Sequence, residues 1–244
     1  MKTILTIGDS HTFGAEILGE GDFSEDNKNH AWPKKLGTLL NYNVINLGES
    51  GASIKRTERV LVDSLAENGI PDLVIIGWTC LGRWEICTGT TLEGNYEYMQ
   101  FNSWAEDIIH FDNMTRYKEL LPIITADDLL AEKYRTVIRC QQLLKSYNIP
   151  YIMFDVMENT KKEAPISGYE SKGNKVDKLW SGNNPLDLKL ETMIDDTFYI
   201  NEVYWEYLFH SKKFKDVQIN GGHLNEAGHE EWAKFLLKKY KELY

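Results

Sequence analysis

The chain has 244 residues, of which 42% are hydrophobic and 26% are charged, and its formal net charge is −10. This composition supports a folded domain and argues against a nucleic-acid partner, because binding a phosphate backbone requires a basic face. No apolar stretch of the sequence is long enough to span a membrane. The three cysteines, Cys80, Cys87 and Cys140, fit no metal-ligand spacing, which favours a cytoplasmic protein with reduced thiols.

Strands and helices alternate along the first part of the chain. Short β-branched or apolar runs predict strands at residues 3–7, 43–47 and 73–76. Amphipathic stretches predict helices from about residue 33 to 40 and from about 54 to 67. In the first of these helices, Leu36, Leu39 and Leu40 are expected to point toward the core.

The second part of the chain continues the alternation and adds two irregular blocks. The regular elements expected here are a helix from about residue 127 to 147, a strand at 150–156 and a final amphipathic helix from Asn225 onward. The irregular blocks cover about residues 86–124 and 157–215, and the second is expected to be helical around 187–209. Strands that alternate with helices predict an α/β fold with a mostly parallel sheet. We therefore expect residues 1–244 to form one domain, with the two blocks as cap insertions.

Loops that follow the predicted strands carry the polar residues of a candidate catalytic site. Ser10 ends a Gly-Asp-Ser turn directly after the first strand, and His223 stands in a glycine-rich loop before the last helix. Parallel strands end at one edge of a sheet, where the fold could bring these two residues together. A serine nucleophile needs a base to take its proton and donors for the oxyanion. His223 is the candidate base, and the candidate donors are the amides of Ser10 and Gly51 and the hydroxyl of Thr79.

These segments, taken in order, resemble the four conserved blocks of the SGNH (GDSL-type) hydrolase superfamily. The first block matches Gly8-Asp9-Ser10, the second resembles residues 46–51, the third falls at residues 77–80, and the last resembles residues 220–228. The resemblance implies a flavodoxin-like three-layer sandwich and a serine nucleophile. It also implies hydrolysis of acyl or acetyl esters of lipids or carbohydrates, with no metal or organic cofactor. The chain is especially similar to compact members encoded by bacteriophages.

Two positions depart from the pattern of that superfamily. Its third block carries an asparagine that donates to the oxyanion, and Thr79 stands there in this chain. The loss of one such donor can cost roughly 10²–10³ in rate. An aspartate usually precedes the histidine by three residues, and here that position is Asn220, which could orient His223 but cannot stabilise its positive charge. Asp216 or a backbone carbonyl could orient the ring instead.

Other residues close to the nucleophile are candidates for substrate contact, each with a structural alternative. His11 either touches the substrate or faces the helix, and Arg83 either binds an anion or forms a salt bridge with Glu85. Trp78 could belong to an aromatic platform for a sugar ring, although aromatic residues in such caps usually serve packing. The acidic residues 16–26 are expected to form a solvated loop.

The first functional hypothesis is a serine hydrolase that cleaves a small acyl ester, such as an O-acetyl group, from a carbohydrate or lipid-like substrate through an acyl-enzyme. The departures at Thr79 and Asn220 motivate a second hypothesis, a catalytically weak or inactive binding protein with the same fold. A third keeps Ser10 as nucleophile but transfers the acyl group to another hydroxyl. The expected partner is a small-molecule or glycan ester, and the oligomeric state is left open.

Overall fold

A computed structural model of the protein describes residues 1–91, 96–102, 126–157, 185–210 and 213–244, which form an α/β fold around a parallel sheet. The strands are β1 (Thr3–Ile7), β2 (Asn43–Asn46), β3 (Leu73–Trp78), β6 (Tyr151–Asp155) and β7 (Tyr199–Ile200). They lie in the order β2-β1-β3-β6-β7, and every neighbouring pair is parallel. This is the strand order of flavodoxin-like sheets.

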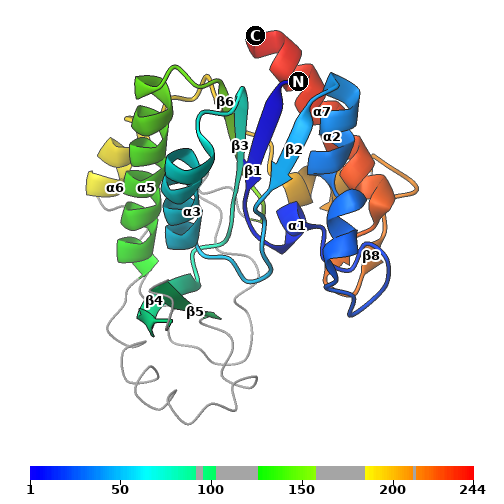
Figure 1. Ribbon diagram of the computed structural model, residues 1–244, viewed down its shortest axis with the longest axis horizontal. Coiled ribbons are helices and arrows are strands. Elements are labelled where there is room, and N and C mark those ends of the chain that lie inside the picture. The colour runs from blue at the N-terminus through cyan, green and yellow to red at the C-terminus, as the bar shows by residue number, and fades with distance from the viewer. Residues whose placement is uncertain (92–95, 103–125, 158–184, 211–212) are drawn as a thin grey trace.

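Helices cover both faces of the sheet (Figure 1). One layer consists of α3 (Ile54–Asn68), α5 (Ala126–Ser146) and α6 (Pro185–Glu191), and the other of α2 (Trp32–Leu40) and α7 (Glu226–Leu243). Strand β3 is fully buried because it serves both layers: Val74 and Ile76 join the core on the α3 and α5 side, while Ile75 packs on the opposite side. Each such side chain contributes about 1.5–3 kcal/mol by its burial. The predicted flavodoxin-like three-layer sandwich is confirmed.

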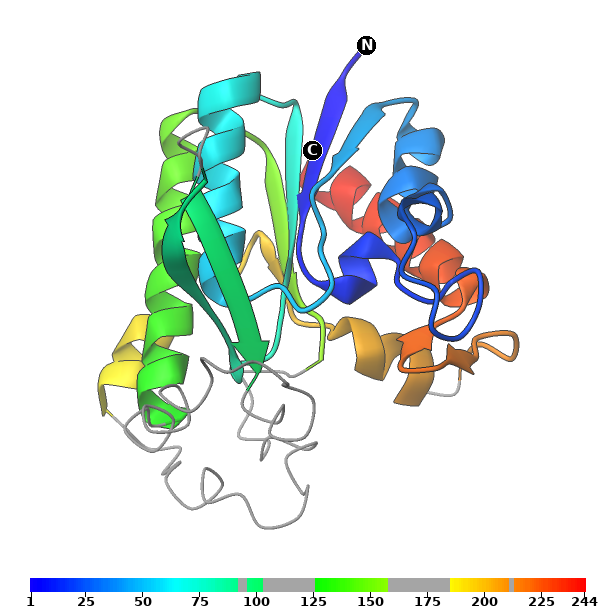
Figure 2. The same ribbon diagram turned by 60° about the horizontal axis from the view of Figure 1, so that its bottom comes forward.

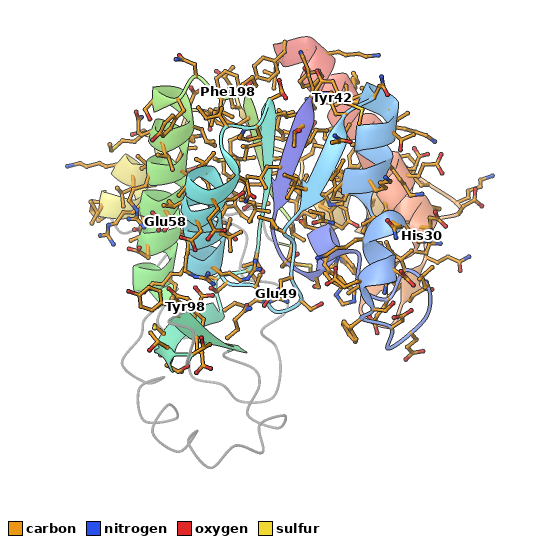
Figure 3. The ribbon with its side chains drawn as sticks, viewed as in Figure 1. His30, Tyr42, Glu49, Glu58, Tyr98 and Phe198 are labelled. Atoms are coloured by element: carbon orange, nitrogen blue, oxygen red, sulfur yellow. The ribbon has the colours of Figure 1, made fainter. Side chains whose placement is uncertain are left out.

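The loops that follow the strands gather at one end of the molecule. Tyr42 and Phe198, which precede β2 and β7, lie at the amino end of the sheet, and Glu49, which follows β2, lies at the opposite end (Figure 3). The short helix α1 (Ser10–Phe13) and the two-stranded ribbon of β8 (Ile219–Asn220) and β9 (His223–Leu224) belong to this carboxyl edge. Helix α1 contacts β9, so the fold brings the beginning of the chain to a segment near its end.

A β-hairpin lies within and just before the first irregular block, where the sequence predicted no regular structure. Its strands are β4 (Arg83–Thr90) and β5 (Tyr96–Asn102), and the hairpin lies against α3 (Figure 2). The hairpin is held by Arg59 of α3, which donates to the Glu85 carboxylate at 2.7 and 2.8 Å and covers the Tyr98 ring. The residue of β4 that is buried is therefore a charged one, Glu85, and a search for alternating apolar residues does not find it.

Two further predictions about local structure are wrong. Residues 187–209 do not form one helix: α6 ends at Glu191, β7 joins the central sheet, and a π-helical turn, η5 (Glu206–His210), follows. Leu39 of α2 points into solvent, whereas Leu36 is buried. The remaining predicted strands and helices are confirmed to within a few residues, and η1 (Glu25–Asn29) is an additional short 3-10 helix.

Much of the two irregular blocks, including residues 103–125 and 158–184, lies outside the described residues. Their role as caps, and the division of the chain into one domain, stay predictions. None of the helices in the described ranges has the length and apolar character needed to cross a membrane. Among the cysteines, none of which forms a disulfide, Cys80 and Cys140 are buried and Cys87 is exposed.

Candidate active site

The turn after β1 holds Ser10 at the start of α1. A Cβ on Gly8 would lie 2.8 Å from the carbonyl oxygen of Gly77, so only glycine allows β1 and β3 to approach so closely here. Asp9 caps the helix, and its Oδ1 accepts a hydrogen bond from the His11 amide at 3.0 Å. Gly14 ends the helix in the left-handed conformation, with φ 93°. The Ser10 side chain is therefore presented by a single helical turn that is tied at both ends.

The loop after β2 packs against this turn. A Cβ on Gly48 would lie 2.5 Å from the amide nitrogen of Phe13, which again requires glycine. Asn46 joins the two segments, since its Nδ2 donates to the carbonyl oxygen of Thr12 at 2.9 Å. The same loop carries Gly51, whose φ is 82°. Within the described residues, the amides of Ser10 and Gly51 donate no hydrogen bond, which leaves both predicted oxyanion donors available.

Glu49 connects this loop to its surroundings at the carboxyl edge. Its carboxylate accepts from Arg56 of α3 at 2.5 Å and from the side chain of Gln100 of β5. Glu49 and Tyr98 mark this end of the molecule, where the hairpin approaches the loop (Figure 3). The hairpin is therefore anchored to the loop that carries Gly51.

Thr79 follows β3 and lies directly beside the turn that carries Asp9 and Ser10. Its hydroxyl donates to Asp9 Oδ2 at 2.8 Å and accepts from Arg83 Nη1 at 2.9 Å. A hydroxyl has one proton, and this one is given to Asp9. In this arrangement Thr79 cannot also donate to an oxyanion, so the side-chain donor expected at this position is already engaged.

Asp9 is the buried anion of this cluster. Burial alone would raise the pKa of Asp9, but attraction to His11 and Arg83, and hydrogen bonds from Thr79 and the His11 amide, outweigh it and lower the pKa. Arg83 Nη1 lies 3.1 Å from Asp9 Oδ2, and Glu85 pairs instead with Arg59. The expected Arg83–Glu85 salt bridge is therefore wrong. Arg83 is held against the turn that carries Asp9 and Ser10.

His223 is held by a carboxylate that the sequence did not indicate. Its Nδ1 lies 2.6 Å from Oε2 of Glu16, a residue that stands just after α1. Both side chains are largely buried. Because Nδ1 is occupied, Nε2 is the ring nitrogen left for proton exchange. The imidazole of a predicted base is thus fixed by an acidic partner from the opposite end of the chain.

Two backbone amides complete the surroundings of the Glu16 carboxylate. Gly21 donates to Oε1 and Gly222 donates to Oε2, each at 2.8 Å. Burial would raise the pKa of Glu16, but the hydrogen bonds from His223 and from the two amides outweigh it and lower the pKa. The prediction that residues 16–26 form a solvated loop is wrong for Glu16, which is buried although much of the rest of this segment is exposed.

Asn220 and Asp216, the residues expected to orient His223, do not contact its ring. Asn220 Nδ2 lies 3.4 Å from the carbonyl oxygen of Glu16, and the carbonyl of Asp216 accepts from the side chain of Asn225. The expectation that one of them holds the imidazole is wrong, because Glu16 takes Nδ1. Asn220 instead helps to hold the backbone of the residue that does so.

His11 lies beside His223 on the buried side of the site. The two ring centroids are 4.8 Å apart, and His11 also packs against Tyr204 and Trp205. Burial is the main reason that the pKa of His11 falls to about 3, so the ring is neutral near pH 7. Only 4% of His11 is exposed, which leaves it little surface for substrate contact.

The aromatic side chains near the site have different exposures. Trp78 is completely buried in the core beneath α3 and α5, so its ring offers no surface on which a sugar could stack. Phe23, which no sequence argument singled out, is 52% exposed and meets the His223 ring edge-on at 6.3 Å. The exposed aromatic surface beside His223 therefore comes from the segment that follows Glu16.

Glu16 and Phe23 are the residues of the site that the sequence analysis missed. The one available signal was negative: asparagine at position 220 meant that an acid, if present, had to come from elsewhere. Nothing in the sequence pointed to Glu16 among the acidic residues, because its position depends on a positive φ of 62° and on contacts with residues about 200 positions away.

Comparison with known proteins supports the fold. No protein-family profile matches the chain, and no curated protein does. Solved structures do match over nearly the whole chain. The esterase EstA from Pseudoalteromonas sp., in a form inhibited by monoethylphosphonate, has a TM-score of 0.52 at 13% identity, covering 99% of this chain and 98% of its own.

Two other structures are similar to the same degree. TesA has a TM-score of 0.52 at 14% identity, and the match covers 100% of both chains. A catalytic mutant of Axe2, an acetylxylan esterase from Geobacillus stearothermophilus, has a TM-score of 0.50 at 14% identity, covering 98% of this chain and 93% of its own. The chain has the fold of these three proteins. At such low identity the likeness concerns the fold and not the substrate or the site.

Proposed function

We propose that this protein is a serine ester hydrolase of the SGNH type, in which Ser10 is the nucleophile and His223 is the base. The observation that carries the proposal is the contact between α1 and β9, together with the hydrogen bond that fixes His223 through Nδ1. A hydroxyl at the start of a helix and an imidazole with a free Nε2 then share one edge of the sheet. This is the arrangement that nucleophilic acyl transfer requires.

In the first half of the reaction, Ser10 Oγ forms a bond to the acyl carbon of the ester while its proton passes to Nε2 of His223. The amides of Ser10 and Gly51 stabilise the negative charge that develops on the carbonyl oxygen. The tetrahedral intermediate then breaks its bond to the alcohol oxygen, which takes the proton from His223. An acyl group on Ser10 and a free alcohol result.

In the second half, water attacks the acyl carbon and gives a proton to His223. The bond between Ser10 Oγ and the acyl carbon breaks, and His223 returns the proton to Oγ. The free acid leaves, and the site is restored. All proton transfers pass through one imidazole, and the chemistry requires no metal or organic cofactor.

The proposed substrate is a small acyl ester, such as an O-acetyl group, on a carbohydrate or lipid-like molecule. Solved structures with this fold include an acetylxylan esterase and the esterase EstA, so the fold accommodates ester hydrolysis, and the choice of an O-acetyl ester rests on the resemblance in sequence. Membership of the SGNH superfamily, a bacteriophage origin and a cytoplasmic location remain predictions from the sequence. The test below addresses the reaction itself.

The proposal is tested with a fluorophosphonate probe, which forms a covalent bond to an activated serine. The wild-type protein should be labelled on Ser10, as identified by mass spectrometry of the labelled peptide, and Ser10→Ala should not be labelled. Ser146→Ala is the matched control, because Ser146 is an exposed serine on α5 whose hydroxyl donates to the Leu143 carbonyl. Wild-type protein that resists the probe and does not turn over p-nitrophenyl acetate would exclude the hydrolase.

A second candidate function, a catalytically weak binding protein, is favoured by the hydrogen bond between Thr79 and Asp9. That bond leaves the oxyanion without the side-chain donor usual in this superfamily. Under this alternative, acyl esters bind without turnover. An acyltransferase, the third hypothesis, would release p-nitrophenol from p-nitrophenyl acetate faster when an alcohol acceptor is added, with the acetylated alcohol as product.

A further inference from the structure

The Glu16 carboxylate is buried against the His223 ring and has several hydrogen-bond donors, unlike the carboxylate of a surface ion pair. Oε2 approaches Nδ1 to 2.6 Å, and the exposed fraction of the Glu16 side chain is only 9%. Amides of Gly21 and Gly222 donate to the two carboxylate oxygens. A carboxylate that accepts three hydrogen bonds has a fixed position and a stabilised negative charge.

The ionised state of Glu16 decides the tautomer of His223. A carboxylate can only accept, so the ring nitrogen that faces it must carry the hydrogen. The proton therefore resides on Nδ1 in the neutral imidazole, and Nε2 presents a lone pair. His11, which packs against the other side of this ring, is neutral at pH 7 and does not compete for the carboxylate.

The backbone around Glu16 is shaped to allow this contact. Glu16 has a φ of 62°, in the left-handed region that residues with a side chain rarely adopt. Gly221 has a φ of 55°, and a Cβ there would lie 2.2 Å from Glu16 Oε1. Asn220 Nδ2 reaches the Glu16 carbonyl. The left-handed backbone at Glu16 and the absence of a side chain at Gly221 both allow the carboxylate to lie beside His223.

We propose that Glu16 is the positioning acid of the site, which orients His223 and stabilises its imidazolium in place of the residue at position 220. This inference rests on the proposed function, because its catalytic consequence requires a base. The contact itself is independent of turnover. The acid is supplied from the segment after the nucleophile helix and not from the loop that carries the histidine.

The test compares Glu16→Gln with Asn220→Ala and with Glu20→Gln. Glu20 is an exposed carboxylate in the same loop, so its variant controls for the loss of one negative charge. Glu16→Gln should lower kcat for p-nitrophenyl acetate by roughly 10²–10⁴-fold with little change in KM, since glutamine cannot stabilise the imidazolium. Asn220→Ala should lower kcat much less, and Glu20→Gln should match the wild type.

A second measurement does not depend on activity. The ¹⁵N NMR signals of the His223 ring should show the hydrogen on Nδ1 in the wild type, because a carboxylate can only accept. In Glu16→Gln the carboxamide can donate as well as accept, so this preference should be weakened or lost, whereas Glu16→Asp should keep part of it; circular dichroism checks that each variant is folded. If the His223 ring gives the same signals in the wild type and in folded Glu16→Gln, or if Asn220→Ala has the larger effect on kcat, the proposal is overturned.

The two measurements separate this inference from the proposed function. A wild-type protein without turnover, in which the NMR signals of the His223 ring still depend on Glu16, would overturn the hydrolase and leave the Glu16–His223 pairing established. A labelled, active wild type with an unaffected Glu16→Gln would overturn the role of Glu16 alone.

Discussion

The base side and the oxyanion side of the candidate site differ in the groups that surround them. On the base side, His223 has a buried acidic partner, Glu16, which is held by two amides. On the oxyanion side, the Thr79 hydroxyl donates to Asp9, and among the described residues the candidate donors that remain are the amides of Ser10 and Gly51. Both places depart from the pattern of the superfamily that the sequence resembles, and the described residues supply a replacement side chain at the base side alone. The absence of a motif residue from its usual position therefore does not show that its place is empty, because a residue remote in sequence can lie there.

Apart from replacement of Glu16 itself, the largest effect that would break this contrast is expected at Gly221. Gly221→Ala places a methyl group against the Glu16 carboxylate and forces a positive φ on alanine. We expect kcat/KM to fall by about 10²-fold, because a displacement of the acid misplaces the base, and stability to fall by about 1–2 kcal/mol.

Gly222→Ala provides the matched control, since a Cβ there would lie 3.9 Å from Glu16 Oε2 and φ is not positive. Its activity and its urea midpoint should change far less than those of Gly221→Ala. Equal losses in the two variants would show that the loop tolerates no side chain at all, and the argument from Glu16 would fail.

On the other side of the site, Thr79→Val tests whether the hydroxyl serves Asp9 or the oxyanion. Valine keeps the shape but leaves the buried Asp9 carboxylate without one donor, which should lower the free energy of unfolding by about 1–3 kcal/mol. If the hydroxyl bonds only Asp9, kcat per folded molecule should fall by less than the roughly 10²-fold loss of an oxyanion donor. Thr79→Ser, which keeps the hydroxyl, should remain close to wild type in both measurements.

The sequence predicted the sheet and the two ends of the site for physical reasons. Residues 73–76 are apolar because β3 is buried on both faces, and Ser10 follows β1 because strands end at the reactive edge. Glu85 and Glu16 were out of reach, since each is buried through a partner remote in sequence. Local sequence patterns predict the burial of apolar residues. The burial of a charged residue depends on its partner, which a local pattern does not contain.

The dependence of stability on pH measures the protonation of His11, the buried histidine beside the site. The pKa of His11 is about 3 in the folded protein, below its ordinary value near 6.5, so the unfolded chain binds more protons between these two values. Stability should therefore fall as the pH is lowered from about 7, by at most about 1.4 kcal/mol per pH unit from this residue. The urea midpoint measured from pH 7 to pH 4 should show this loss.

His11→Phe removes that titration while keeping a flat ring against Tyr204 and Trp205. Its stability should depend less steeply on pH over the same range. His229 is also buried, with a pKa well below its ordinary value, so some dependence should remain in the variant. Parallel curves for wild type and His11→Phe would mean that His11 is already charged in the folded protein.

The smallest effect is expected at Phe23, whose exposed ring meets His223. In the proposed reaction, the leaving alcohol takes its proton from His223, which lies beside this ring. Phe23→Ala should raise KM roughly 2- to 10-fold for esters of bulky alcohols and leave kcat for small esters unchanged. Leu18→Ala, an exposed apolar residue of the same segment, is the control, and an equal change in KM there would remove the special role of Phe23.

The pairing of Glu16 with His223 joins residues 207 positions apart in a chain of 244. Such a contact forms late in folding, because closing so long a loop has an entropic cost that local contacts do not repay. Ribosomal synthesis makes Glu16 207 residues before His223. In the proposed hydrolase, an intermediate in which these two segments have not yet met would lack the oriented base and would not cleave an ester.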